Sequence, residues 1–220
     1  MRGTTSEGVA PKSATRLADL LADASEPTAT DFAAPLRAVG IGLLAGRAHY
    51  EIVMRRLLRA RCSVWIATAN LKELLVEGPR RSARSRDRFG SVLTCLDELA
   101  AAGVELRLLH AGQPSRAFRR SFDACPRLIK GGLELRQCPR VHFKTVIVDG
   151  EFCYLGSANW TGAGLGAKGE GRRNFEIGMV SEDEDLIDQV QGMYEAVWSG
   201  SQCRGCKLRE DGCEAPLDST

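Results

Sequence analysis

The sequence predicts an α/β fold built on a mixed sheet that is flanked by helices. Helical and strand patterns alternate between residues 47 and 109, which is the order expected of strands joined by crossover helices. Farther on, two apolar alternating runs flank Asp149-Gly150, a pair typical of a tight hairpin because both turn positions need positive φ. Crossover connections in one half and a hairpin in the other predict a sheet with strands in both directions.

The first half supplies two helix–strand pairs. Apolar residues recur at helical spacing from Tyr50 to Leu58, and the run 63–68 is typical of a buried strand. A second apolar helical pattern covers 92–99, and Gly103 is a suitable C-terminal stop. Alternation over 104–109 predicts the next strand.

The second half is richer in strands. Short apolar runs predict strands at 133–136, 141–148, 151–155 and 175–180, and a Gly-rich loop covers 162–173. The longest predicted helix follows, with an apolar stripe from Leu186 to Trp198.

The start of this last helix carries two signals. Ser181 and Glu184 have the spacing of a capping box, in which a serine hydroxyl and a glutamate satisfy the first backbone N–H groups. The acidic run 182–185 suits the positive end of the helix dipole. We therefore expect Ser181 to be the N-cap.

Composition divides the chain into three segments. Residues 1–34 are rich in Ala, Thr, Ser and Asp and predict a flexible N-terminal arm. Residues 35–199 carry the helix and strand patterns of the main domain, and residues 200–220 form a cysteine-containing tail.

Charge and hydropathy exclude several classes of protein. Apolar residues make up 44% and charged residues 26% of the chain, so it is neither disordered nor a coiled-coil rod. The longest nearly uncharged stretch, Ala38–Gly46, is far below the ~20 residues of a membrane span. The first residues lack the apolar core of an export signal, so we expect the reducing cytoplasm.

The segment 141–149 contains the strongest candidates for catalytic side chains. His142 and Lys144 are two apart on a predicted strand, so their side chains share one face about 7 Å apart. An imidazole beside an ammonium suits phosphate chemistry, because one attacks or protonates and the other holds negative charge. Ser157 and Asn159 return a hydroxyl and an amide to the same end of the sheet, and Glu176 can orient a histidine.

This constellation resembles the phospholipase D superfamily. The pattern H-x-K-x4-D followed by x6-G-S is filled by His142, Lys144, Asp149, Gly156 and Ser157. The stretch G-S-x-N-W-T is similar to the bacterial endonuclease branch. The resemblance covers about residues 62–198.

The resemblance implies a phosphodiesterase that needs no metal or other cofactor for catalysis. His142 would be the nucleophile that forms a phosphohistidine, and Glu176 would orient it. Lys144, Ser157 and Asn159 would bind the phosphate. Asp149 belongs to the motif and counts among the catalytic residues with His142, Lys144 and Glu176, although its plainest role is the hairpin turn.

The motif occurs once, whereas the family's active site needs two facing copies. Neither His49 nor His110 starts a second copy. The resemblance therefore implies a symmetric homodimer with the active site on the two-fold axis and one His142 from each chain.

Basic clusters favour nucleic acid, DNA or RNA, as the substrate, because clustered arginine is typical of phosphate-backbone binding. A solvated, flexible loop is an equal alternative for the first cluster. A lipid phosphodiesterase and a non-catalytic nucleic-acid-binding module also stay open. The basic residues are Arg80, Arg81, Arg84, Arg86 and Arg88, then Arg116, Arg119 and Arg120, then Lys168, Arg172 and Arg173.

The tail contains Cys203, Cys206 and Cys213, of which the first two have the C-x2-C spacing of a metal knuckle. A structural zinc ion is one interpretation, with Cys62, Cys125, Cys138 or another group as the fourth ligand. Reduced thiols, a disulfide or a docking element for a protein partner are the others.

Overall fold

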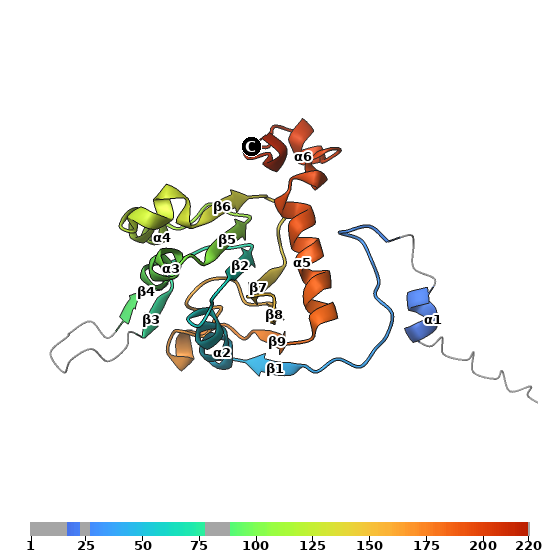
Figure 1. Cartoon of the computed structure of the whole chain (residues 1–220), viewed down its shortest axis with the longest axis horizontal. Coiled ribbons are helices and arrows are strands. Elements are labelled where there is room, and N and C mark those ends of the chain that lie inside the picture. The colour runs from blue at the N-terminus through green and yellow to red at the C-terminus, as the bar shows by residue number, and fades with distance from the viewer. Residues whose placement is uncertain (1–16, 23–26, 78–88, 220) are drawn as a thin grey trace, which may run out of the picture. The chain divides into compact units, whose positions relative to one another are not determined.

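A computed structural model describes residues 17–22, 27–77 and 89–219 (Figure 1). The chain divides into two compact units, Met1–Ala38 and Val39–Thr220. In the first unit, α1 covers Leu17–Ala22 and an isolated bridge pairs Thr28 with Asp31. The second unit contains the sheet and all the residues discussed below.

Seven strands form one mixed sheet in the order β1-β9-β8-β7-β2-β5-β6. The strands β2, β5 and β6 are parallel to one another, whereas β7, β8, β9 and β1 are joined by antiparallel pairings. The mixed sheet is therefore as predicted. Its strands are β1 (Gly42–Ala45), β2 (Ser63–Thr68), β5 (Glu105–His110), β6 (Glu134–Gln137), β7 (Lys144–Val148), β8 (Phe152–Gly156) and β9 (Ile177–Ser181).

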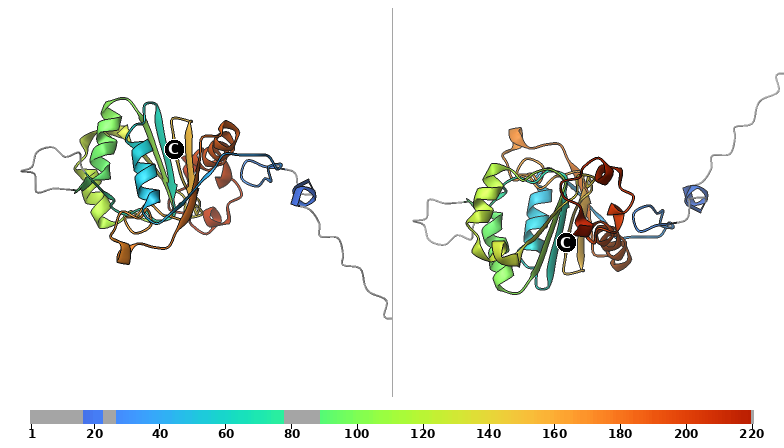
Figure 2. Two further views of the ribbon diagram at one scale, coloured as in Figure 1. Left: turned by 90° about the horizontal axis from the view of Figure 1, so that it is seen from below. Right: turned by 90° about the horizontal axis from the view of Figure 1, so that it is seen from above.

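Helices cover both faces of this sheet (Figure 2). One face carries α2 (Ala48–Leu57), α3 (Val92–Ala101) and α4 (Arg116–Asp123), and the other carries α5 (Glu184–Trp198). A separate two-stranded sheet pairs β3 (Leu75–Glu77) with β4 (Phe89–Ser91). Short helical turns cover Leu128–Gly132, Glu170–Arg172, Ser201–Cys203 and Leu217–Ser219, and α6 covers Lys207–Glu210.

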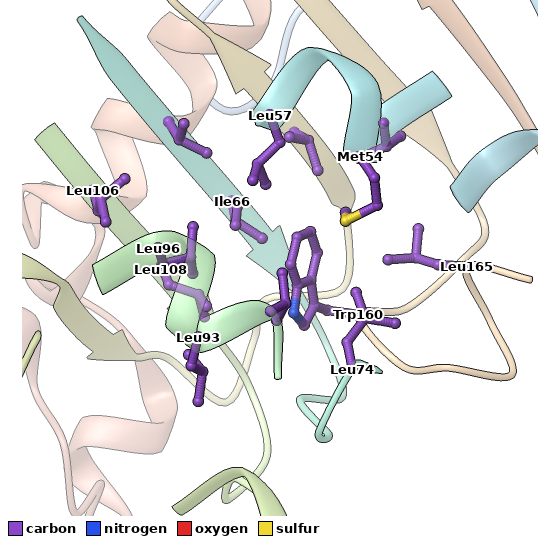
Figure 3. Close-up of a cluster of buried hydrophobic side chains, with 14 of the residues drawn as sticks. Met54, Leu57, Ile66, Leu74, Leu93, Leu96, Leu106, Leu108, Trp160 and Leu165 are labelled. Carbon is purple, nitrogen blue, oxygen red and sulfur yellow. The ribbon is translucent and has the colours of Figure 1, made fainter. Parts of the chain in front are cut away.

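The larger core lies between the sheet and the helices α2 and α3 (Figure 3). Leu57 and Leu93 come from these helices, Ile66 and Leu108 from the sheet, and all four side chains are at most 1% exposed. Burying such side chains stabilises the fold by about 1.5–3 kcal/mol each, so this layer fixes the sheet that presents the site.

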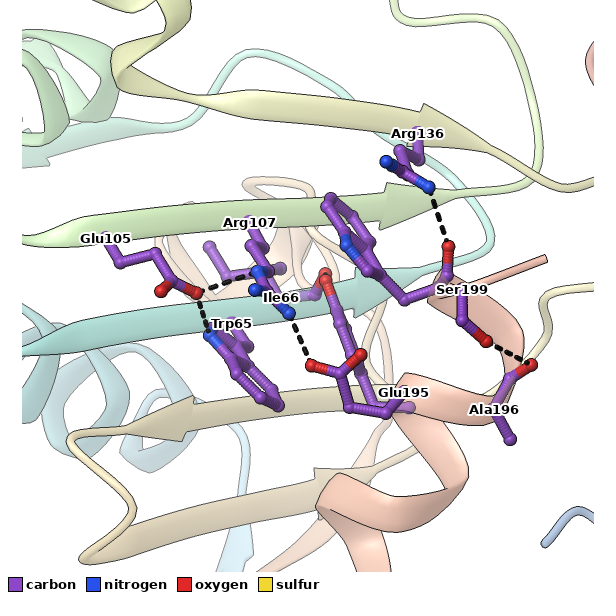
Figure 4. Close-up of polar contacts among 10 residues, drawn as sticks. Trp65, Ile66, Glu105, Arg107, Arg136, Glu195, Ala196 and Ser199 are labelled. Carbon is purple, nitrogen blue, oxygen red and sulfur yellow. Dashed lines mark hydrogen bonds and ion pairs between the residues drawn. The ribbon is translucent and has the colours of Figure 1, made fainter. Parts of the chain in front are cut away.

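A ladder of aromatic rings and arginine attaches α5 to the opposite face (Figure 4). Tyr194 stacks between Trp65 and Trp198, with ring centroids 5.3 and 5.6 Å away. The guanidinium of Arg107 lies 4.7 Å from the Trp65 ring and forms an ion pair with Glu195 of α5. These contacts hold α5 in one position on the sheet.

The hairpin prediction is confirmed, because Asp149 and Gly150 have φ of 57° and 67°. The capping-box prediction is wrong. Ser181 is the last residue of β9, paired with Cys153, and its hydroxyl donates to the Gly40 carbonyl at 2.6 Å. Asp183 caps α5 instead, accepting a hydrogen bond from the Leu186 N–H at 2.9 Å.

Candidate active site

One edge of the sheet gathers the ends of five strands. The strands β2, β5 and β8 finish there at Thr68, His110 and Gly156, whereas β7 starts there at Lys144. Glu176 immediately precedes β9 at the same edge, because Gly178 of β9 pairs with Gly156. The predicted site residues on β7, β8 and β9 are therefore brought together.

His142 and Lys144 form a close pair. Lys144 Nζ lies 3.2 Å from His142 Nδ1, and the ammonium also donates to the His142 carbonyl. This is shorter than the spacing of about 7 Å expected from a regular strand, because His142 lies before β7 and the Lys144 side chain folds back over it.

The two side chains differ in their exposure. His142 is exposed, so its imidazole is accessible to a ligand, whereas Lys144 is only 7% exposed. Burial lowers the pKa of the Lys144 ammonium, and the negative charge of Glu176 partly offsets this shift.

Glu176 holds Ser157 rather than His142. One carboxylate oxygen accepts from the Ser157 hydroxyl, and the other accepts from Asn174 Nδ2 at 3.1 Å. No hydrogen bond joins Glu176 to His142 within the described ranges. The expectation that Glu176 orients His142 is therefore replaced by a role at Ser157.

Asn159 is fixed by residues that the sequence analysis missed. Its Oδ1 accepts from the Asn70 N–H at 3.0 Å and from the Thr68 hydroxyl at 3.3 Å. The side-chain NH2 group is therefore turned away from these partners and can donate to a phosphate oxygen. The only sequence signal for them was the two polar residues Thr68 and Asn70 at the end of a buried strand.

Asp149 does not belong to this edge. It lies beyond the far end of β7, five residues after Lys144, at a span of about 16 Å. Its carboxylate accepts hydrogen bonds from the backbone N–H groups of Arg61, Cys62 and Ser63, which hold the start of β2. The structure therefore does not support a catalytic role for Asp149, because its carboxylate binds the backbone at the opposite end of the sheet.

The structure describes two of the three predicted basic clusters. Arg172 and Lys168 are exposed on the loop between β8 and β9, and Arg173 is half-buried there. On α4, the three arginines at 116, 119 and 120 are exposed and only Phe118 is buried. Arg80, Arg81, Arg84, Arg86 and Arg88 lie outside the described residues.

The tail packs against the domain. Leu217 and Cys203 belong to the apolar cluster that also contains Cys138 and Trp198. Cys203, Cys206 and Cys213 are free thiols. Across residues 17–22, 27–77 and 89–219, no three His, Cys, Asp or Glu side chains are grouped closely enough to hold a metal ion, so the predicted zinc site gains no support.

In the part of the chain that the structure describes, every helix is too short or too polar to cross a bilayer.

Comparisons with known proteins agree with this fold. Residues 53–198 match the family described as cardiolipin synthase, PLD-like domain, close to the range of about 62–198 expected from the sequence. NucT from Helicobacter pylori aligns with a TM-score of 0.51 and 16% identity, over 72% of this chain and 94% of that one. Nuc from Salmonella typhimurium, a phospholipase D family member, aligns with a TM-score of 0.52 and 16% identity, over 73% and 95%. No curated protein sequence matches the chain. At these identities the two structures show a shared fold.

Proposed function

The chain belongs to the phospholipase D-like family, and from this premise we propose that it is a phosphodiesterase that cleaves nucleic acid, DNA or RNA, without a catalytic metal ion. The observation that carries the proposal is the exposed His142 imidazole with Lys144 Nζ at 3.2 Å. Around this pair, Ser157, Asn159 and Glu176 lie at the same edge of the sheet. A nucleophile, a cation and hydrogen-bond donors in one place are what phosphoryl transfer needs.

The proposed reaction has two steps. A ring nitrogen of His142 attacks phosphorus, and the bond from phosphorus to the leaving oxygen breaks as a second histidine protonates that oxygen. Water then attacks the phosphohistidine, gives its proton to the second histidine, and releases the phosphate monoester and free His142. Lys144 and the Asn159 NH2 group stabilise the negative charge on the phosphoryl oxygens in both steps.

The second histidine is supplied by a second copy of the chain in this proposal, because the motif occurs once. An exposed apolar patch next to the site supports a homodimer. Phe175, which precedes Glu176, is fully exposed, and Leu43 and Ile177 are 72% and 60% exposed. Leu43 of β1 pairs with Met179 of β9, and paired residues share a face of the sheet. Ile177 is two residues from Met179 on the same strand, so Leu43 and Ile177 point to the same face. Exposed apolar patches of this kind mark association surfaces.

Nucleic acid is favoured as the substrate by the charge around the site. The exposed cations of the β8–β9 loop and of the first turns of α4 follow strands that end at the catalytic edge. Neutralising successive phosphates with such cations gives binding that is strong, salt-dependent and weakly selective for sequence. The family description names a lipid enzyme, so a lipid phosphodiester is the competing substrate.

The test compares wild type with His142→Asn on DNA, on RNA and on anionic liposomes, all in EDTA. We expect wild type to cleave nucleic acid and the variant to lose at least about a thousandfold of the rate. Hydrolysis of lipid alone would overturn the substrate assignment. Salt-dependent binding of DNA without cleavage would make the chain a non-catalytic module, and loss of activity in EDTA would contradict the metal-independent route.

A further inference from the structure

A buried histidine and tyrosine lie directly beneath the catalytic edge. His49, in the first turn of α2, has no exposed surface, and Tyr154 of β8 is 1% exposed. Their rings meet edge-on, with centroids 5.7 Å apart. Burying two polar side chains is costly unless each polar atom has a hydrogen-bond partner, so we expect both side chains to be hydrogen-bonded.

The two side chains form a continuous chain of hydrogen bonds. His49 Nε2 lies 3.2 Å from the Glu176 carbonyl, and because a carbonyl only accepts, Nε2 carries the hydrogen. His49 Nδ1 lies 2.9 Å from the Tyr154 hydroxyl and accepts from it in the neutral ring. On the other side of the hydroxyl, the Ala158 N–H interacts with the Tyr154 oxygen and lowers its pKa, although burial raises that pKa by more.

Both ends of this chain are site segments. Ala158 separates Ser157 from Asn159, and Glu176 carries the carboxylate that holds Ser157. Burial raises the pKa of the Tyr154 hydroxyl, so it stays protonated and remains a donor.

Two glycines make room for the rings. Gly156 and Gly178 are partners in the β8–β9 ladder. A Cβ on Gly156 would collide with the Tyr154 hydroxyl, and a Cβ on Gly178 would lie 2.7 Å from Tyr154 Cε2 and 3.0 Å from His49 Cε1. Only glycine at both positions lets His49 and Tyr154 reach the backbone under the site.

We propose that His49 and Tyr154 are positioning residues that fix the Ser157–Asn159 segment relative to Glu176, so that the phosphate-binding groups converge. This inference rests on the proposed function, since it assigns these residues a task in the same reaction. Within the described residues, neither side chain forms a hydrogen bond to Lys144 or His142, so both act through the backbone on either side of the site, at Glu176 and beside Ala158.

Tyr154→Phe tests the proposal, because it removes the hydroxyl and keeps the ring. Tyr194→Phe is the matched control, since Tyr194 is equally buried and its hydroxyl donates to the Ile66 carbonyl, away from the site. In Tyr154→Phe we expect kcat to fall about 10- to 100-fold with a much smaller change in KM, because a displaced group at a catalytic centre costs this much. The control should keep the kcat of wild type.

His49 gives an independent variant pair. Glutamine places an amide near the former Nε2 position and can still donate to the Glu176 carbonyl, whereas alanine cannot. We therefore expect His49→Gln to keep more of the kcat than His49→Ala. Equal losses, or a loss of thermal stability with an unchanged kcat in Tyr154→Phe, would mean that the pair merely fills the core.

Amide hydrogen exchange separates this inference from the proposed function, because it needs no substrate. The Ser157 N–H donates to the Ile177 carbonyl at 3.0 Å, so its exchange reports the β8–β9 junction. In Tyr154→Phe the Ser157 and Ala158 amides should exchange about tenfold faster, while Val146 of β7 should not change. If wild type proves inactive on every phosphodiester, faster exchange of these two amides still supports the role of His49 and Tyr154 in fixing the segment. Unchanged exchange overturns that role.

Discussion

At the catalytic edge, polar side chains are held by protein partners and keep their remaining hydrogen-bonding capacity for a ligand. The Oδ1 of Asn159 is taken by Asn70 and Thr68, which leaves the NH2 group to donate. Lys144 is held against His142. A site fixed in this way loses little conformational freedom when a phosphate binds, and this is the basis of its expected electrostatic catalysis.

The lowered pKa of Lys144 predicts a specific pH profile. Burial favours the neutral amine, so the ammonium charge is lost, as pH rises, earlier than for an ordinary lysine. The value of kcat/KM should therefore fall on the alkaline side. The arginine of Lys144→Arg keeps its charge at every accessible pH. The fall of kcat/KM in alkali should therefore move to higher pH in this variant, even though its rate at neutral pH drops about 10- to 100-fold. An alkaline limb that is identical in both proteins would show that another group titrates.

Asp149 predicts a loss of stability without a loss of catalysis. Burial raises the pKa of its carboxyl, but hydrogen bonds from Ser63, Cys62 and Arg61 outweigh this and leave the pKa lowered. A lowered pKa contributes stability above the unfolded value of about 3.9 and loses it as pH falls through the folded value.

Asp149→Asn tolerates the positive φ and should lower the free energy of unfolding by about 1–2 kcal/mol at neutral pH. Denaturant titrations should show this difference shrinking in acid. If Asp149→Asn unfolds like wild type but has lost its catalytic activity, Asp149 has a catalytic role instead.

Residue types at fixed spacing revealed the reacting groups, but not their supports. His142, Lys144, Ser157 and Asn159 are close in sequence, so their convergence follows from strand geometry. Their supports are distant in sequence. His49 is 127 residues from Glu176, and Thr68 and Asn70 are 91 and 89 residues from Asn159, so only tertiary packing brings them to the site.

At the scale of elements, α5 shows why the start of a helix is hard to place from sequence. The segment 181–184 offers two candidate caps, Ser181 and Asp183. Pairing of Ser181 with Cys153 keeps that residue in β9, so the helix begins two residues later than the capping box predicts.

Asp183→Ala should lower the free energy of unfolding by about 1 kcal/mol, whereas Asp183→Asn should cost much less because asparagine is also a good cap. Thermal or urea unfolding of both variants measures this. Equal losses would mean that the charge of Asp183, rather than its hydrogen bond to Leu186, is what stabilises α5.

Elements with a periodic apolar pattern were predicted well, whereas the edge strand β1 and the polar helix α4 were not predicted. The strand 63–68 matches β2, and the last helix matches the body of α5. The four-residue β1 buries only Leu44, and α4 buries only Phe118 among exposed arginines. Elements of this kind are ordered by neighbours rather than by an apolar pattern, so their sequences carry little signal.

At the scale of the whole molecule, one chain carries half of the groups that the proposed reaction uses. If two copies share one active site and each must supply His142, a mixed dimer of wild type and His142→Asn is inactive. Activity of randomly mixed dimers should then follow the square of the wild-type fraction. Refolding the two proteins together at several ratios and measuring cleavage tests this. A linear dependence would mean that each chain works alone.

The proposed function depends above all on His142 becoming covalently bound to phosphorus during turnover. The most direct measurement quenches the protein with a nucleic-acid substrate early in the reaction, in alkaline denaturant, where a phosphoramidate bond survives. Peptide mass spectrometry then locates the adduct. We predict a nucleotide joined through its phosphorus to His142 in wild type, and neither adduct nor cleavage in His142→Asn. Cleavage without any adduct on His142, retained by the asparagine variant, would contradict it.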